Sequence, residues 1–238
     1  MSPALKLLCS LLLSGLLLVG QPIREVTPQH NPDDLLLVNR QWRISRNYYP
    51  EVRLSDVPGQ IRSLRPVAAE ALEAMFAACK EETGAQLISV SGYRNYAKQE
   101  KIYGDKLKRV NGSRARADEY VARPGASEHQ TGLTMDLGQK GKEKSTLGAS
   151  FGETPGGIWL RENCWRFGFI LRYDQGWEET TGYSYEPWHV RYVGLKHAQY
   201  IHEHPMPLED YLQLVRTRRL KDALLSPGDL VLEEVDVP

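Results

Sequence analysis

The chain has 238 residues, of which 41% are hydrophobic and 25% are charged, proportions that are ordinary for a folded protein. Its 30 basic and 30 acidic residues balance to a formal net charge of +0, so no positive field favours nucleic acid and we expect no nucleic-acid partner. The sequence has no internal repeat and no low-complexity tract. Its length suits one domain with a substantial core.

The first 20 residues have the pattern of a targeting segment. Lys6 supplies a positive charge, and the apolar run from Leu7 to Val19 fits a signal-peptide core but is short for a membrane span of ~20 residues. Leu18 stands where cleavage prefers a small residue, so a cleaved signal peptide and an N-terminal membrane anchor both remain open. Under either alternative we expect an extracytoplasmic protein, secreted or anchored to the cell membrane.

Composition divides the remainder into three parts. Residues 21–34 contain three prolines and few apolar side chains, which predicts a linker. Residues 35–219 are predicted to form the folded domain, and residues 220–238 an acidic C-terminal tail. For Cys79 and Cys164 an extracytoplasmic location permits a disulfide, whereas their apolar helical surroundings favour two buried free thiols, and both alternatives stay open.

Apolar spacing and the positions of Gly and Pro predict a mixture of helices and strands. A helix is expected over residues 66–83, because Pro66 suits a first turn and Gly84 suits a C-terminal cap. The other expected helices are 96–110, 113–122, 158–167, 194–203 and 208–219. The expected strands are 35–40, 86–90, 133–137, 169–171 and 189–193. Two long loops are expected, over residues 138–157 and 174–184.

Two motifs carry candidate metal ligands. His129 and Asp136 lie seven residues apart, with Gly132 between them to permit a turn of the backbone. Apolar residues alternate around Asp136 in the predicted strand, which directs its carboxylate away from the core and toward a site. His189 supplies a second imidazole. Two imidazoles and a carboxylate leave an open position on zinc, so we predict His129, Asp136 and His189 as ligands of a catalytic zinc ion. Each residue alone has a simple structural explanation, but the two motifs together favour the metal site.

Glu186 stands three residues before His189 and is the predicted catalytic base. Pro187 removes a backbone donor and biases Glu186 toward an extended conformation, so the arrangement differs from helical zinc-peptidase motifs. Zinc lowers the pKa of a bound water to about 7. We expect Glu186 to accept the proton of that water and to deliver it to the leaving amine of a cleaved peptide. A surface glutamate is the alternative.

Three further residues are candidates for contacts with a substrate. Arg94 follows a predicted strand, where a guanidinium can stabilise the oxyanion of a tetrahedral intermediate, although a structural ion pair is an equal alternative. Ser127 and Gln99 carry groups that can hydrogen-bond a substrate. Capping of a loop by Ser127 and a solvated helix face for Gln99 are the alternatives.

Several motifs occur in the order found in one known family. They span residues 35–205 and comprise Leu37-Val38-Asn39-Arg40, Tyr49-Pro50, Ser91-Gly92-Tyr93-Arg94, Pro124-Gly125, Ser127-Glu128-His129 with Gly132 and Asp136, and Glu186-Pro187-Trp188-His189 with Arg191, Tyr192 and Val193. In these motifs the chain resembles the VanY-type D-alanyl-D-alanine carboxypeptidases.

The resemblance implies a function for the predicted site. It implies one Zn2+ per chain on the three predicted ligands, Glu186 as the base, Arg94 at the scissile carbonyl, and Ser127 and Gln99 at the C-terminal end of the peptide. The implied fold is a single α+β domain with a central antiparallel sheet flanked by helices, as in zinc DD-peptidases and the hedgehog signalling domain. The implied substrate is the stem peptide of bacterial peptidoglycan, trimmed at its terminal D-alanine.

One position departs from the family pattern. The residue two before Asp136 is usually alanine in the family and is Thr134 here. Because Thr134 is predicted on the same strand face as Asp136, we expect it either to add a hydrogen bond to the site or to narrow the pocket.

The exact substrate bond stays open at the level of sequence. The motifs do not separate cleavage of D-Ala-D-Ala from cleavage of the bond between an L-centre and D-Ala in a tetrapeptide. A strict dipeptidase is less favoured, since no residue is a candidate for reading a free amino terminus. A non-catalytic module that binds cell-wall peptide around a structural zinc would be a protein of a different class, and Glu186 argues against it. We expect a monomer.

Overall fold

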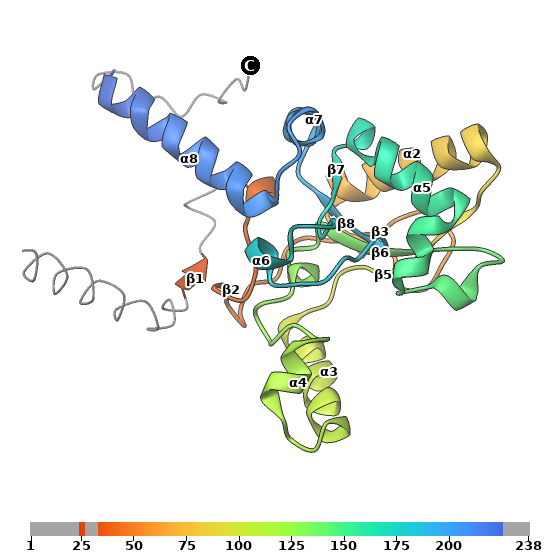
Figure 1. Ribbon diagram of the computed structural model, residues 1–238, viewed down its shortest axis with the longest axis horizontal. Coiled ribbons are helices and arrows are strands. Elements are labelled where there is room, and N and C mark those ends of the chain that lie inside the picture. The colour runs from red at the N-terminus through yellow and green to blue at the C-terminus, as the bar shows by residue number, and fades with distance from the viewer. Residues whose placement is uncertain (1–23, 27–32, 226–238) are drawn as a thin grey trace, which may run out of the picture.

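A four-stranded antiparallel sheet lies at the centre of the protein, for which a computed structural model describes residues 24–26 and 33–225 (Figure 1). Its strands are β5 (Leu87–Ser91), β6 (Thr134–Gln139), β7 (Phe169–Leu171) and β8 (His189–Tyr192), in the order β5-β6-β8-β7. β6 has a hydrogen-bonded neighbour on each side, and all of its residues are buried. The strand that carries Asp136 is therefore a central strand of the sheet.

Helices α2 (Pro66–Thr83) and α5 (Pro155–Asn163) pack against each other and contribute to the main core. α2 begins at Pro66 and ends at Thr83, and the capping residue Gly84 has a left-handed φ of 72° while its N–H donates to the Lys80 carbonyl. The apolar face of α2 meets one face of the sheet, as the alternation along residues 133–137 predicts. This core includes Leu72, Met75, Phe76, Leu133, Met135, Leu137, Trp159 and Leu160.

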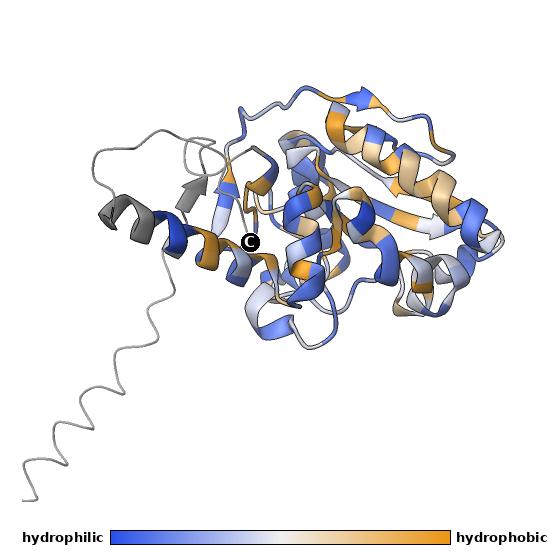
Figure 2. Cartoon of the chain, turned by 90° about the horizontal axis from the view of Figure 1, so that it is seen from above, coloured by the Kyte–Doolittle hydropathy of each residue, from blue (hydrophilic) through white to orange (hydrophobic). Residues whose placement is uncertain are grey.

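Helices α7 (Leu195–Glu203) and α8 (Leu208–Leu225) close a second core. The buried side chains of α8 recur at helical spacing, and Figure 2 shows hydrophobic and hydrophilic residues interspersed along this helix. The later turns of α8 project away from the sheet (Figure 1). The buried residues of α8 in this core are Leu208, Tyr211, Leu212 and Val215.

Helices α3 (Tyr96–Arg109) and α4 (Arg114–Asp118) form a lobe beside the sheet (Figure 1). Asn95 caps α3 by accepting a hydrogen bond from the Lys98 N–H at 2.9 Å. The Tyr103 hydroxyl donates to Asp118 Oδ1 at 2.7 Å and ties α3 to α4. This lobe supplies one wall of the cavities described below.

The remaining elements are short. β1 (Arg24–Val26) pairs in parallel with β2 (Trp42–Ile44), and β3 (Arg53–Leu54) pairs antiparallel with β4 (Ser63–Leu64). The other short segments are α6 (Glu178–Thr181), η2 (Asp33–Leu35), η3 (Glu128–Thr131), η4 (Glu143–Ser145), η5 (Ala149–Glu153) and η6 (Cys164–Phe167).

The predicted fold class is confirmed: the domain is α+β with a central antiparallel sheet and helices packed around it. The predicted strand over residues 35–40 is wrong, because η2 ends at Leu35 and no strand follows before Trp42. The carbonyls of Asp34 and Leu36 instead accept hydrogen bonds from Arg191 Nη2, at 3.1 and 2.8 Å. A side chain therefore satisfies backbone groups that a neighbouring strand would otherwise pair.

Two predicted boundaries differ from the structure because of local caps. The predicted loop 138–157 contains η4, η5 and the start of α5, where Thr154 Oγ1 accepts from the Gly157 N–H at 3.0 Å and Pro155 occupies the first turn. The predicted helix 113–122 is shorter, since α4 ends at Asp118.

Only some of the predicted domain boundaries fall within the residues that the structure describes. Residues 24–26 of the predicted linker form β1 through their pairing with β2, and the leader over residues 1–20 lies outside the described residues. α8 runs through the predicted boundary at residue 219 to Leu225, and the rest of the predicted tail, residues 226–238, is also outside. Within residues 24–26 and 33–225, no helix has the length and hydropathy needed to cross a membrane.

Candidate active site

Strand pairing brings the two predicted metal motifs together. Asp136 on β6 lies directly opposite His189 on β8 in the antiparallel register. His129 comes from η3, which ends at Gly132, and the φ of 73° at Gly132 turns the chain from η3 into β6. The local η3–turn–β6 segment and one long-range strand pair thus place all three residues.

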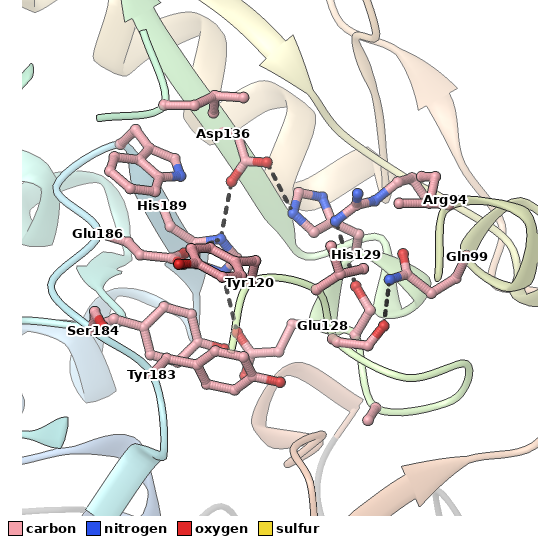
Figure 3. A pocket seen from close by; sticks show the side chains of 18 of the residues that line it. Arg94, Gln99, Tyr120, Glu128, His129, Asp136, Tyr183, Ser184, Glu186 and His189 are labelled. Atoms are coloured by element: carbon pink, nitrogen blue, oxygen red, sulfur yellow. Dashed lines mark hydrogen bonds and ion pairs between the residues drawn. The ribbon is translucent and has the colours of Figure 1, made fainter. Parts of the chain in front are cut away.

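Asp136 lies between the two histidines (Figure 3). Its Oδ2 is 3.1 Å from His129 Nε2, and its Oδ1 is 2.9 Å from His189 Nδ1. The residues His129, Asp136 and His189 are only 2%, 7% and 5% exposed, and one ligand atom from each lies within 4.8 Å of the others. Two imidazole nitrogens and a carboxylate oxygen converging on one buried point fit a zinc ion that keeps a fourth position open.

The outer nitrogen of each imidazole also faces an acceptor. His129 Nδ1 lies 2.8 Å from the Gly92 carbonyl oxygen, which leaves Nε2 free to bind a metal. His189 Nε2 faces Glu128 Oε2 at 3.6 Å, and neither atom has a hydrogen-bond partner among the described residues. Burial disfavours the charged imidazole of His189, but the hydrogen bond to Asp136 and the nearby Glu128 carboxylate outweigh it and raise the pKa of His189 to about 9.

Glu128 anchors a buried ion network that the sequence analysis missed. Its Oε1 accepts from Arg172 Nε and from Arg191 Nη1, both at 2.9 Å. Arg172 also donates to both carboxylate oxygens of Glu209 on α8, at 2.9 and 2.6 Å. Burial raises the pKa of Glu128, but the two guanidinium groups outweigh it and hold that pKa well below its usual range. The sequence does contain a sign of this network: Arg172 directly follows an apolar strand, and Arg191 lies within another. A buried arginine needs a carboxylate partner, so these two positions could have indicated buried ion pairs.

Glu186, the predicted catalytic base, lies beside the candidate metal ligands. Its Oε2 is 3.7 Å from His189 Nδ1, its N–H donates to the Tyr173 carbonyl at 2.9 Å, and its carbonyl accepts from the His189 N–H at 3.1 Å. The second of these bonds closes a tight turn through Pro187, and the first ties Glu186 to the segment that follows β7. Burial raises the pKa of Glu186 to about 7, against the opposing effect of His189.

Arg94, Ser127 and Gln99 all line the same cavity. Arg94 and Gln99 are labelled in Figure 3. The Arg94 N–H donates to the His129 carbonyl at 3.1 Å, and Arg94 Nη2 lies 3.5 Å from Ser127 Oγ. Burial lowers the pKa of Arg94, and the negative charges of Asp136 and Glu186 oppose that effect. Gln99 is buried, and its Nε2 donates to the Ala122 carbonyl at 2.7 Å, while its Oε1 has no partner among the described residues. The alternative of a solvated helix face for Gln99 is therefore excluded.

The cavity has a volume of about 430 Å³ and joins the metal motif to an aromatic wall. Thr134 is not among its lining residues, so the prediction that it narrows the pocket is wrong. The Thr134 hydroxyl is buried and has no hydrogen-bond partner in the described part of the chain, which also excludes the expected bond to the site. The aromatic residues that line the cavity are Tyr120, Tyr173, Tyr183, Tyr185 and Trp188.

Comparisons with known proteins agree with this geometry. The VanY family, described as D-alanyl-D-alanine carboxypeptidase, matches residues 61–195. YodJ of Bacillus subtilis strain 168 is 42% identical over 194 residues, which cover 78% of this chain and 70% of YodJ. A structure of the LdcB LD-carboxypeptidase has a TM-score of 0.72 and 40% identity, and the match covers 80% of this chain and 90% of that chain. A structure of a mutant vancomycin-resistance D,D-pentapeptidase VanY in complex with Zn(II) has a TM-score of 0.63 and 35% identity, covering 76% of this chain and 99% of that chain.

The fold and the buried donor set together define a metallo-carboxypeptidase. The match to each of these two structures covers at least three quarters of this chain and nine tenths of the other chain. The chain belongs to the VanY family of D-alanyl-D-alanine carboxypeptidases.

Proposed function

We propose that this protein is a zinc-dependent carboxypeptidase that removes the C-terminal D-alanine from stem peptides of bacterial peptidoglycan. The observation that carries the proposal is the convergence of His129, Asp136 and His189 on one buried point, with Glu186 beside them and a cavity in front. A module that only binds peptide has no need of a carboxylate at that position.

His129 Nε2, His189 Nδ1 and one oxygen of Asp136 would hold a single zinc ion. When bound, this ion supplies a Lewis acid toward the scissile carbonyl and toward water. The chain holds the three donors in place before the ion arrives, through the Gly92 carbonyl, the β6–β8 register and the Glu128 network. Such outer contacts fix the tautomer and orientation of ligand histidines.

Glu186 moves the proton in this proposal. Its carboxylate accepts a proton from the attacking water and passes it to the amine that leaves as D-alanine. The nearby position of Glu186, 3.7 Å from His189 Nδ1, puts it within reach of a water between the donor set and the cavity. General catalysis of this kind contributes about 10²–10⁴ in rate.

Arg94 and its neighbours would position the peptide. The Arg94 guanidinium lines the cavity beside His129, where it can steady the negative charge that develops on the scissile carbonyl oxygen. Ser127 Oγ and the unpaired Oε1 of Gln99 are the groups that would hold the C-terminal end. The Ser127 hydroxyl can donate to a carboxylate, and Gln99 Oε1 can accept from an amide N–H.

We propose that the protein prefers the tetrapeptide with a single terminal D-alanine to the peptide that ends in D-Ala-D-Ala. The basis is the higher TM-score and identity of the match to the LdcB LD-carboxypeptidase than of the match to the D,D-pentapeptidase VanY. Because such stems occur outside the cytoplasmic membrane, we further propose that residues 1–20 direct or anchor the protein there, and that it acts as a monomer.

Release of D-alanine tests the proposal. Residues 21–238 would be incubated with a peptide ending in Lys-D-Ala and with one ending in Lys-D-Ala-D-Ala, each with added zinc and with chelator. We expect zinc-dependent release from both, faster from the tetrapeptide type. Faster release from the second peptide would reverse the preference and leave the carboxypeptidase in place. Zinc binding without release from either peptide would favour the binding module instead.

A further inference from the structure

A second cavity of about 270 Å³ adjoins the catalytic one and has a distinct charge. The two cavities share a wall, since Val121, Ala122, Ala126 and Tyr183 line both. The remaining lining residues of the second cavity are Arg40, Arg43, Asp118 and Arg123. Three guanidinium groups and one carboxylate give this small volume an excess of positive charge in a chain of formal net charge +0.

One of the three arginines is already neutralised. Arg123 donates to both carboxylate oxygens of Asp118, from Nε at 2.9 Å and from Nη2 at 2.5 Å. Burial opposes this pair, but hydrogen bonds from Arg123 and Tyr103 outweigh it and lower the pKa of Asp118. Asp118 is therefore ionised and paired with Arg123, and the described lining of the cavity holds no second carboxylate for Arg40, which is exposed, or for Arg43, which is partly buried.

The other two arginines present donors to the cavity. Arg40 is held in place, because its Nη2 donates to the Asp118 carbonyl at 2.9 Å and its guanidinium lies over the Tyr183 ring at 4.8 Å. Arg43 Nε is buried and has no hydrogen-bond partner among the described residues. The Tyr183 hydroxyl, in the shared wall, is likewise buried without a partner in that part of the chain. Burial raises the pKa of Tyr183, so this hydroxyl stays protonated.

Unsatisfied buried donors are rare in folded proteins and commonly mark a site for a ligand or ordered water. Here two such donors, Arg43 Nε and the Tyr183 hydroxyl, belong to residues that line one cavity together with Arg40, and this cavity shares lining residues with the peptide site. A carboxylate suits this set, because arginine forms charge-assisted hydrogen bonds with planar anions. We propose that the second cavity is a carboxylate subsite that takes a carboxylate group of the peptide substrate, with Arg43 and Tyr183 as its donors.

This inference rests on the proposed function, and the stem peptide offers two sources of the group. One source is a carboxylate upstream of the scissile bond, such as the free α-carboxylate that a γ-linked glutamyl residue leaves in the stem. The other source is the C-terminal carboxylate of D-alanine itself, which would then be bound here rather than by Ser127. Both present the same chemistry to the arginines, and kinetics with matched peptides separates them.

The experiment compares two N-acetylated peptides that end in γ-D-glutamyl-L-lysyl-D-alanine, one with the glutamyl α-carboxylate free and one with it as an amide. KM for D-alanine release would be measured for the wild-type protein, Arg43→Gln and Tyr183→Phe. Arg114→Gln on α4 is the matched control, since Arg114 is exposed and lines neither cavity. For an upstream carboxylate we expect a KM for the free-carboxylate peptide that is lower by about tenfold to a hundredfold, the range of one charge-assisted hydrogen bond. Arg43→Gln reduces this ratio to near one, and Arg114→Gln preserves it.

The remaining outcomes are also decisive. If the subsite takes the C-terminal carboxylate, Arg43→Gln raises KM equally for both peptides and weakens inhibition by free D-alanine. If neither Arg43→Gln nor Tyr183→Phe changes either KM or the inhibition by D-alanine, the subsite is overturned.

Two controls separate the subsite from folding and from the proposed function. The melting temperature of Arg43→Gln should not be lower than that of the wild type, because Arg43 Nε has no hydrogen bond to lose in the described structure. If no peptide is cleaved at all, the proposed function fails. The subsite can then be tested by calorimetric titration, which measures the affinity of the zinc-loaded protein for each of the same two peptides. A carboxylate preference in binding that Arg43→Gln removes would still support the subsite, and equal affinities for both proteins would reject it.

Discussion

The Glu128 network gives the sharpest test of how the protein holds its metal site. Glu128 is 2% exposed and pairs with Arg172 and Arg191, both fully buried, while Glu209 supplies the second carboxylate. The two negative and two positive charges of this network cancel. Glu128→Gln keeps the size of the side chain but leaves one uncompensated positive charge in the interior.

The size of the effect follows from that burial. Removal of one partner from a buried ion pair costs about 3–5 kcal/mol. For a domain of this length, each kcal/mol lowers the melting temperature by about 2–4 °C, so we expect a decrease of about 6–20 °C. Because Glu128 faces His189 Nε2, we also expect zinc affinity to fall by about 10–100-fold, the usual effect of losing a group that orients a ligand.

The matched control is Glu73→Gln. Glu73 pairs with Arg53 at 2.8 Å, but both side chains are partly exposed, so the same substitution should cost about 0–1 kcal/mol. The assay is thermal unfolding followed by circular dichroism for the metal-free protein, with zinc affinity measured by competition against a chelating dye. A decrease in melting temperature no larger than that of Glu73→Gln would refute the reasoning.

Four further predictions concern the two buried cysteines, two glycines and Arg94. Cys79 and Cys164 are free and buried, and burial raises the pKa of Cys164 to about 12. We therefore expect that neither thiol is alkylated until the protein is unfolded. Peptide mapping that shows the two cysteines joined by a disulfide would contradict this. Gly104→Ala should stabilise the protein by about 0.5–1 kcal/mol in urea unfolding, because Gly104 lies inside α3 with no atom within 4 Å of an added Cβ. Gly157→Ala should destabilise the protein, since the added Cβ would lie 2.0 Å from the Phe151 carbonyl oxygen. A Gly157→Ala protein that is more stable than Gly104→Ala would contradict this packing. Arg94→Ala should lower kcat for D-alanine release by about 10²–10³ as expected for loss of an oxyanion donor, and a loss below tenfold would remove Arg94 from the chemistry.

The parts of the fold that could be predicted are those with a local cause. α2 has a proline at its start, a glycine after its end and an apolar stripe between them, and its predicted bounds are those of the structure. The candidate metal ligands were also predictable, because His129 and Asp136 sit in one short motif whose strand alternation directs the carboxylate. The pairing of that motif with His189 depends on the β6–β8 register, which only the structure reveals.

The parts that could not be predicted depend on contacts between distant residues. The partners of Glu128 are 44 and 63 residues further along the chain, and nothing near Glu128 identifies them. The run over residues 35–40 has the composition of a strand, but its carbonyls serve Arg191, which is 155 residues from Leu36. Gln99 occupies a polar helix that indicated a solvated face, yet the fold buries it against Ala122.

The most direct test of the account is the rate of D-alanine release by Glu186→Gln at a measured zinc content equal to that of the wild type. Glu179→Gln, an exposed change on α6, is the control for the substitution itself. We predict that Glu186→Gln retains one zinc ion per chain and loses about 10²–10⁴ in kcat, the contribution of general acid–base catalysis. A zinc-loaded Glu186→Gln protein with undiminished release would contradict the assignment of Glu186 as the group that moves the proton.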